Sequence, residues 1–168
     1  MQHSFDGAEP ILASSASVAD VAYLVGDVAV GERASLWPFA CLRGDHAPVT
    51  VGDDTNVQEF AMLHGADVGD RVSVGHGATI DFATISDDAI VGMGSRVLGG
   101  AHVEEGCIVA ANAVVTREQT VPAGHLAYGA PAETRPLTDD QRERIEENWR
   151  TYADRGERFV AAGPHHHP

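Results

Sequence analysis

The amino-acid sequence predicts an all-β fold, a parallel β-helix of hexapeptide repeats, followed by a C-terminal α-helix. Two observations predict this fold class. An aliphatic side chain recurs at nearly every sixth position from Leu24 to Val121, and from Thr138 onward the chain is polar with apolar residues at helical spacing. A helical period of 3.6 or simple alternation does not explain a six-residue step sustained over about a hundred residues, whereas a hexapeptide β-helix does.

Each hexapeptide supplies one short strand and one corner, and three of them close a triangular coil. The aliphatic side chains then stack inside the coils at the spacing of neighbouring strands, about 4.8 Å. Glycine often follows the aliphatic residue, as at Gly31 and Gly52, and permits a tight corner. The inward positions are expected to be Leu24, Val30, Leu36, Leu42, Val51, Val57, Leu63, Val68, Val74, Ile80, Ile85, Val91, Val97, Val103, Val109, Val115 and Val121.

The departures from the six-residue step mark irregular turns. Leu42 and Val51 are nine positions apart, and the intervening segment RGDHAPVT is expected to bulge out as a loop. The steps that begin at Leu63 and Ile80 are one residue short. These irregular turns gather around His64 and Asp81.

Residues 1–137 are predicted to form the β-helix domain, and residues 138–162 a helix that packs along it. Thr138 and Gln141 form a capping box at the start of that helix. Its apolar residues, Ile145, Trp149 and Tyr152, have helical spacing. We assign no function to the tail at residues 163–168.

The charge of the chain excludes some partners. There are 25 acidic and 11 basic residues, every basic residue is arginine, and the net charge is −14. This surface argues against nucleic acid or anionic lipid as a partner, because no positive face exists to bind phosphates. This acidic surface resembles that of halophilic proteins, whose charge excess is screened by salt, and we expect a salt-rich cytoplasm.

There is no apolar run of membrane length. Cys41 and Cys107 are expected to be buried thiols.

Counting the faces of the prism places polar residues in one column. Arg43, His64 and Asp81 follow aliphatic residues three hexapeptides apart, so their side chains point outward together. His76 belongs to another face and could meet this column only from a neighbouring chain. Two histidines and a carboxylate suit zinc, cobalt or iron with a position left open for water. A histidine at a β-helix corner can instead be merely solvated.

The chain resembles the gamma-class carbonic anhydrases over about residues 10 to 155. The resemblance implies a homotrimer of left-handed parallel β-helices, each with a C-terminal α-helix. It also implies reversible hydration of carbon dioxide to bicarbonate at zinc held between subunits by three histidines, two from one subunit and one from its neighbour. The blocks that carry the resemblance are SLWPFACLRGDHAPVTVGDDTNVQEFAMLH, VGDRVSVGHGATI, ISDDAIVGMGSRVLGGAHVEEGCIVAANAVVT and AYGAPAETRPLT.

The resemblance assigns roles to individual residues. His64 and His76 match two of the ligand histidines, and Asp81 stands where the family has the third. This exchange lowers the charge of a zinc site from +2 to +1, so water on the metal should lose its proton less readily than the pKa of about 7 at a three-histidine site. Four further residues match the family: Arg43 and Asp45 at the subunit interface, and Asn56 and Gln58, which orient water or bicarbonate.

His46, in the irregular segment beside Arg43, is either a replacement ligand, a proton shuttle or a surface histidine. The predicted function is carbonic anhydrase activity, reduced by the exchange at Asp81. One alternative is a hexapeptide acyltransferase that uses a histidine as general base toward an acyl-CoA, although the sequence has no basic cluster for the CoA phosphates. The other is a non-catalytic metal-binding trimer.

Overall fold

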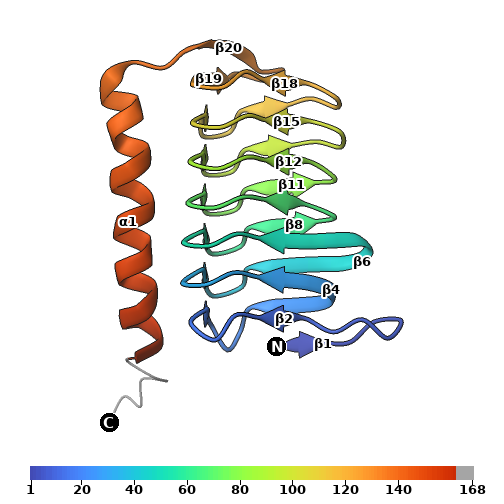
Figure 1. Cartoon of the computed structure of the whole chain (residues 1–168). Coiled ribbons are helices and arrows are strands. Elements are labelled where there is room, and N and C mark those ends of the chain that lie inside the picture. The colour runs from blue at the N-terminus through green and yellow to red at the C-terminus, as the bar shows by residue number, and fades with distance from the viewer. Residues whose placement is uncertain (162–168) are drawn as a thin grey trace.

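The computed structural model describes residues 1–161, and the tail assigned to residues 163–168 lies outside them. The chain winds into a stack of coils, with one long helix beside the stack (Figure 1). Strands pair in parallel with the coils above and below, except for the antiparallel pair β19 and β20. The predicted fold class, a β-helix with a C-terminal α-helix, is confirmed.

Within residues 1–161 the strands form two sheets. The 12-stranded sheet wraps around two faces of the prism, because β6 pairs with β8 on one face and with β9 on the next. It contains β1 (Gln2–His3), β2 (Ile11–Leu12), β4 (Tyr23–Val30), β6 (Cys41–Val51), β8 (Met62–His64), β9 (Asp67–Val68), β11 (Thr79–Asp81), β12 (Thr84–Ile85), β14 (Arg96–Val97), β15 (His102–Val103), β17 (Val114–Val115) and β18 (Thr120–Val121).

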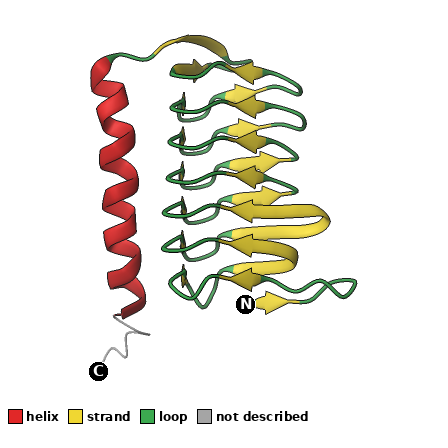
Figure 2. Cartoon of the chain, viewed as in Figure 1, coloured by secondary structure: helices red, strands yellow, loops and turns green. Residues whose placement is uncertain are grey.

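The third face is the 8-stranded sheet, against which the helix packs. Figure 2 shows this helix in red beside the stacked strands. The sheet contains β3 (Ser17–Val18), β5 (Ser35–Leu36), β7 (Asn56–Val57), β10 (Ser73–Val74), β13 (Ile90–Val91), β16 (Ile108–Val109), β19 (His125–Tyr128) and β20 (Glu133–Pro136).

The core is the column of aliphatic side chains that the repeat predicts. Every one of the inward positions from Leu24 to Val121 is at most 4 % exposed. Smaller residues such as Ala61 and Ala78 fill the space between them and are also buried. Cys107 is buried as expected, but Cys41 is only half-buried.

Helix α1 (Asp139–Ala161) runs from the last coil back toward the first (Figure 1). The capping box is present, since Thr138 N–H donates to Gln141 Oε1 at 3.1 Å and Gln141 N–H donates to Thr138 Oγ1 at 3.3 Å. Ile145 is buried, and the Tyr152 ring meets the Trp37 ring edge-on at 5.7 Å. Within the described residues, α1 lacks the apolar length needed to cross a membrane.

The prediction of a loop between Leu42 and Val51 is wrong. These residues belong to the 11-residue strand β6, which pairs with β4 in the coil below. The segment does project from the prism, but together with β4, which lengthens in parallel (Figure 1). Because the two coils extend side by side, each backbone finds hydrogen-bonding partners in the other, and an extended strand replaces a loop.

Candidate metal centre

Three adjacent strands bring the predicted polar column together. Arg43 on β6 is paired in register with His64 on β8, and His64 is paired with Asp81 on β11. In a parallel sheet such partners point to the same side, so the three side chains lie one above another outside the core. The column predicted from the repeat is therefore present within one chain.

His64 is held from three sides. Its side chain is only 11 % exposed. Its Nδ1 lies 2.9 Å from Asp81 Oδ1, and its Nε2 lies 2.8 Å from Arg43 Nη2. The ring of Phe82 meets the imidazole edge-on, with centroids 4.5 Å apart. These contacts leave the imidazole little rotational freedom.

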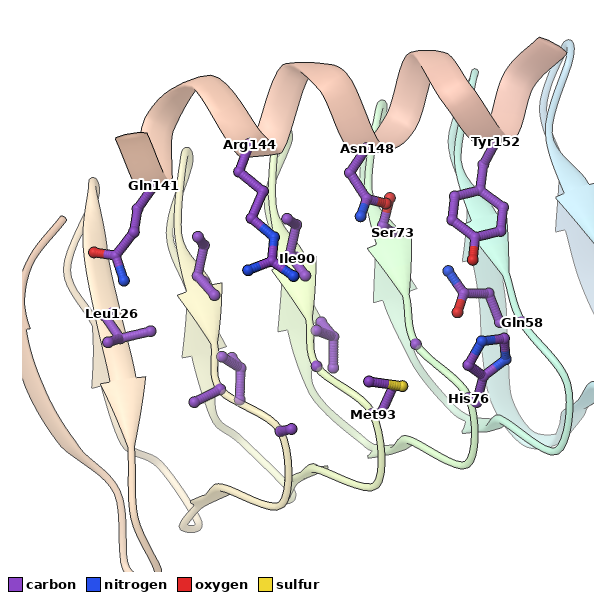
Figure 3. A pocket seen from close by; sticks show the side chains of 17 residues that line it. Gln58, Ser73, His76, Ile90, Met93, Leu126, Gln141, Arg144, Asn148 and Tyr152 are labelled. Atoms are coloured by element: carbon purple, nitrogen blue, oxygen red, sulfur yellow. The ribbon is translucent and has the colours of Figure 1, made fainter. Parts of the chain in front are cut away.

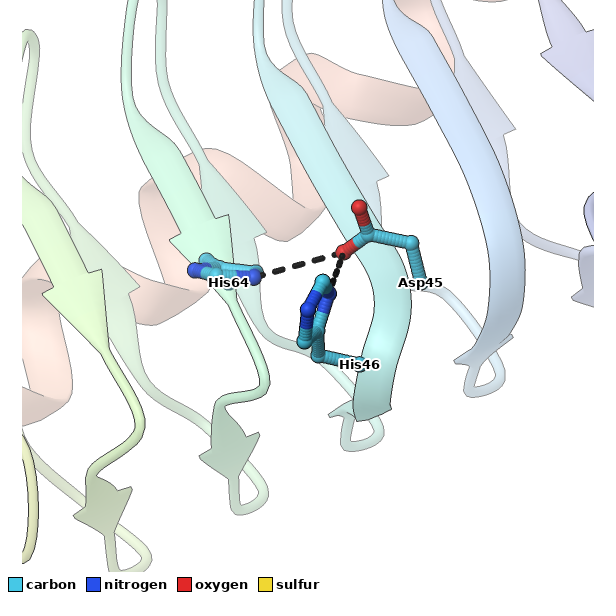
Figure 4. Close-up of side chains that lie close together, drawn as sticks. All are labelled: Asp45, His46 and His64. Carbon is cyan, nitrogen blue, oxygen red and sulfur yellow. Dashed lines mark ion pairs between the residues drawn. The ribbon is translucent and has the colours of Figure 1, made fainter.

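Asp45 connects His64 with His46 (Figure 4). Its Oδ1 lies 3.3 Å from His64 Nε2, 3.5 Å from His46 Nδ1 and 3.1 Å from Arg43 Nε. Burial raises the pKa of the Asp45 carboxyl, but the charge of Arg43 and the contact with His46 outweigh burial, so the pKa lies below its ordinary value. Asp45 is thus ionised at neutral pH.

Gly44 fixes the backbone between Arg43 and Asp45. A Cβ at this position would lie 2.0 Å from the carbonyl oxygen of Asp27 on β4. Only glycine permits this approach of the two strands. The close packing of β4 against β6 therefore sets where Arg43 and Asp45 point.

His76 lies apart from this column. It follows β10 at a corner of the 8-stranded sheet, and its Nδ1 is 2.7 Å from Glu59 Oε2. With Gln58 and Tyr152 it lines one end of a groove of about 400 Å³ between this sheet and α1 (Figure 3). Within one chain, His76 and His64 belong to different faces.

Asn56 and Gln58 belong to the His76 side of the molecule. Both are buried on or beside β7. Asn56 Nδ2 donates to Ser73 Oγ at 2.8 Å, and Gln58 Nε2 donates to Asn56 Oδ1 at 3.0 Å. The pair is a fixed polar arrangement at the end of the groove that contains His76.

Sequence reasoning missed two partners of the histidines. Glu59 pairs with His76, and Phe82 packs on His64. The repeat could have revealed Glu59, because it occupies the position that corresponds to His76 in the preceding coil. Phe82 directly follows Asp81, but its contact with His64 depends on its left-handed backbone, with φ at 50°.

The donor set fits a transition metal. One ligand atom from each of Asp45, His46 and His64 lies within 4.8 Å of the others. Asp45 Oδ1 is buried and, among the described residues, receives no hydrogen bond. Imidazole and carboxylate donors suit zinc, cobalt and iron, so the residues are compatible with such an ion.

Comparisons with known proteins identify similar chains. Residues 82–117 match the family model described as bacterial transferase hexapeptide (six repeats). The chain is 36% identical to gamma carbonic anhydrase 2, mitochondrial, of Arabidopsis thaliana, an alignment that covers 85% of this chain and 56% of the plant protein. It is 34% identical to gamma carbonic anhydrase 1, mitochondrial, of the same plant, over 96% of this chain and 62% of the relative. The chain thus spans less than two thirds of each plant protein.

A bacterial relative matches over nearly its whole length. The carbonic anhydrase of Geobacillus kaustophilus (strain HTA426) is 34% identical, with 96% of this chain and 92% of the relative covered. Among solved structures, a putative acetyltransferase of Bacillus cereus superposes with a TM-score of 0.91 at 34% identity, covering 95% of this chain and 96% of that one.

Proposed function

Because the chain belongs to the gamma-class carbonic anhydrase family of hexapeptide-repeat proteins, we propose that it is a metal-dependent carbonic anhydrase that interconverts carbon dioxide and bicarbonate. The observation that carries this proposal is the fixed imidazole of His64, with Asp81 at Nδ1 and Arg43 at Nε2. Such an imidazole is oriented before any ligand arrives, which favours tight and specific metal binding.

The proposed metal is zinc, with cobalt or iron as alternatives. It would supply a Lewis acid that activates water as a nucleophile at neutral pH. The ligand set predicted from the sequence is His64 and Asp81 of one subunit with His76 of its neighbour in a homotrimer. The separation of His76 from the column within one chain supports a site that needs two subunits.

Other residues of this chain have supporting roles in the proposal. Gln58 and Asn56, fixed to each other and to Ser73, would orient water or bicarbonate beside His76. Arg43 and Asp45, whose Nε and Oδ1 are 3.1 Å apart, would hold the subunit interface. The exposed His46 would either move protons between the site and solvent or replace a ligand of the metal. The charge of −14 supports a salt-rich cytoplasm as the setting.

The test is a stopped-flow assay of carbon dioxide hydration with metal content measured on the same samples. His64→Ala should lower the rate per subunit at least about 100-fold, because loss of a direct ligand should cost at least as much as loss of a residue that orients one. His102→Ala, an exposed histidine on β15, should leave the rate unchanged. A fully metal-loaded wild type that hydrates carbon dioxide no faster than His64→Ala would refute the proposal.

A second candidate is acyl transfer from an acyl-CoA. Two observations favour it: the superposition on the putative acetyltransferase of Bacillus cereus, and the groove between α1 and the 8-stranded sheet, into which Arg144 projects (Figure 3). Acetyl-CoA should then raise the melting temperature, whereas a carbonic anhydrase without a CoA site should be unaffected. A trimer that binds metal but lacks both activities would be a non-catalytic relative.

A further inference from the structure

We propose that His46 supplies the metal ligand that is missing at position 81, and that Asp81 is a positioning residue that orients His64. This inference rests on the proposed function, since it concerns the ligands of that metal. The ligand set would be His46 and His64 of one subunit with the partner subunit's His76. It differs from the sequence-based set in exchanging Asp81 for His46.

The shortest contacts of His64 define which nitrogen carries the proton. A carboxylate oxygen only accepts, so Nδ1 of His64, which lies 2.9 Å from Asp81 Oδ1, carries the hydrogen. Arg43 only donates, so Nε2, at 2.8 Å from its Nη2, presents its lone pair. Two longer contacts, both 3.3 Å, suggest the opposite assignment: Arg43 Nη2 to Nδ1 and Asp45 Oδ1 to Nε2. The shorter pair sets the tautomer, because hydrogen bonds weaken with distance.

Asp81 is therefore placed as the carboxylate that holds a ligand histidine. A ligating histidine commonly donates its other ring N–H to a carboxylate, which fixes the ring and its tautomer. His76 has the same arrangement, since its Nδ1 lies 2.7 Å from Glu59 Oε2. In both cases the carboxylate stands one coil away from the histidine. The two family histidines of this chain thus each have a positioning carboxylate, and Asp81 fills that role for His64.

His46 is placed to be the replacement ligand. Its ring is nearly perpendicular to that of His64, at 79°, with centroids 6.1 Å apart. The donor atoms of the two histidines lie within 4.8 Å of each other. Two nitrogens on one tetrahedral zinc are about 3.4 Å apart, given metal–nitrogen distances of about 2.0–2.1 Å. A small rotation of His46, whose side chain is 75 % exposed, covers the difference.

Asp45 is less suited to complete the site than His46. Its Oδ1 lies 3.1 Å from Arg43 Nε, so the guanidinium already balances its charge. Arg43 Nη2 stands where an ion on His64 Nε2 would bind. Because the Arg43 side chain is 41 % exposed, this end of the guanidinium can turn outward while Nε stays with Asp45.

The exchange also restores the charge of the site. Three neutral imidazoles leave a divalent ion with its full +2 charge, whereas Asp81 as ligand would lower it to +1. His46 thus gives the chain the electrostatics of a three-histidine centre, although position 81 holds an aspartate.

The test uses Co²⁺ titration of the full-length chain, followed by visible absorption and by bound metal per subunit. His64→Ala removes a proposed ligand but retains the histidines at 165–167, so the Co²⁺ that this variant binds measures the background contributed by the tail. We expect His46→Ala to weaken Co²⁺ binding at least about 100-fold, and Asp81→Ala to weaken it about 10- to 100-fold. Asp81→Asn should stay within about tenfold of wild type with an unchanged spectrum, because the amide oxygen still accepts from Nδ1–H.

Either of two results would overturn the inference. One is wild-type affinity and spectrum in His46→Ala. The other is loss of binding in Asp81→Asn equal to that in His64→Ala, since an amide cannot replace a carboxylate ligand. Light scattering and thermal unfolding verify that each variant is a folded trimer, and His102→Ala is the matched control. Hydration of carbon dioxide by the wild type tests the proposed function separately. If Co²⁺ binding depends on His46 but the wild type does not hydrate carbon dioxide, the proposed function is refuted and the assignment of His46 as a metal ligand is supported.

Discussion

The Oδ1 of Asp81 lies 2.9 Å from Nδ1 of His64, directly above it in the stack of coils. The pairing register of β8 with β11 produces this contact, because it sets the two Cα atoms opposite each other. The hydrogen bond turns Nε2 toward Arg43 and Asp45 on β6. The hexapeptide repeat that forms the core thus also orients the imidazole of His64.

The corner that carries His76 has an apolar surface that suits the interface of the proposed homotrimer. Phe39 and Phe60 stack there at 5.2 Å between centroids, yet are 55 % and 68 % exposed. Phe60→Glu should raise the dissociation constant of the proposed trimer at least about tenfold, as loss of an aromatic anchor does. Light scattering in physiological salt measures it. Phe5→Glu, at the exposed N-terminal turn, is the matched control, and equal effects of both changes would argue against this interface.

Gly44→Ala should destabilise the projecting part of β4 and β6. The added methyl would overlap the Asp27 carbonyl oxygen, so the strands must separate, at a cost of about 1–3 kcal/mol. Urea unfolding measures the loss, and Co²⁺ affinity should fall with it because Arg43, Asp45 and His46 move. Gly99→Ala is the control, since its Cβ would come closest to the flexible end of Arg117, at 3.2 Å, and would lie 3.7 Å from the Asp81 carbonyl oxygen, which is ordinary van der Waals contact. Equal stability of the two variants would contradict the packing argument.

The alignment of candidate site residues on one face of the β-helix could be predicted from the sequence, but the residues that surround them in space could not. The six-residue step gives each side chain a face and a coil, so the alignment of Arg43, His64 and Asp81 could be counted. Residues between Leu42 and Val51 have no such register, and the sequence alone could not show that they form a strand. The place of His46 beside His64 follows from that strand, which depends on pairing with β4. Contacts of α1, such as Tyr152 with Trp37, depend on how the helix docks.

The two thiols should differ in reactivity. Burial raises the pKa of both the Cys41 and the Cys107 thiol, so less thiolate is present at pH 8 than in a free cysteine. Cys107 is also inaccessible in the core. Iodoacetamide should therefore label Cys41 slowly, faster as the pH rises above 8, and Cys107 only after unfolding. Peptide mass spectrometry distinguishes the sites, and labelling of Cys107 in the folded protein would show that the coil opens there.

Asp81→His separates the two possible roles of Asp81 most sharply. If Asp81 were a ligand, the substitution would raise the site charge from +1 to +2, increase metal affinity and move the rate-versus-pH curve to lower pH. If Asp81 orients His64, the substitution removes the carboxylate from Nδ1. We then expect Co²⁺ affinity to fall by about tenfold or more, with no move of the pH curve to lower pH.

The double variant His46→Ala/Asp81→His completes this argument. With His46 removed, an imidazole at position 81 would stand where the family has its third ligand, so it should recover part of the Co²⁺ affinity that His46→Ala loses. The recovery is measured against His46→Ala alone, with bound metal and the visible spectrum determined on the same samples. An affinity of the double variant no higher than that of His46→Ala would mean that the two positions cannot exchange the ligand role, and that the geometry around His64 requires a carboxylate at position 81.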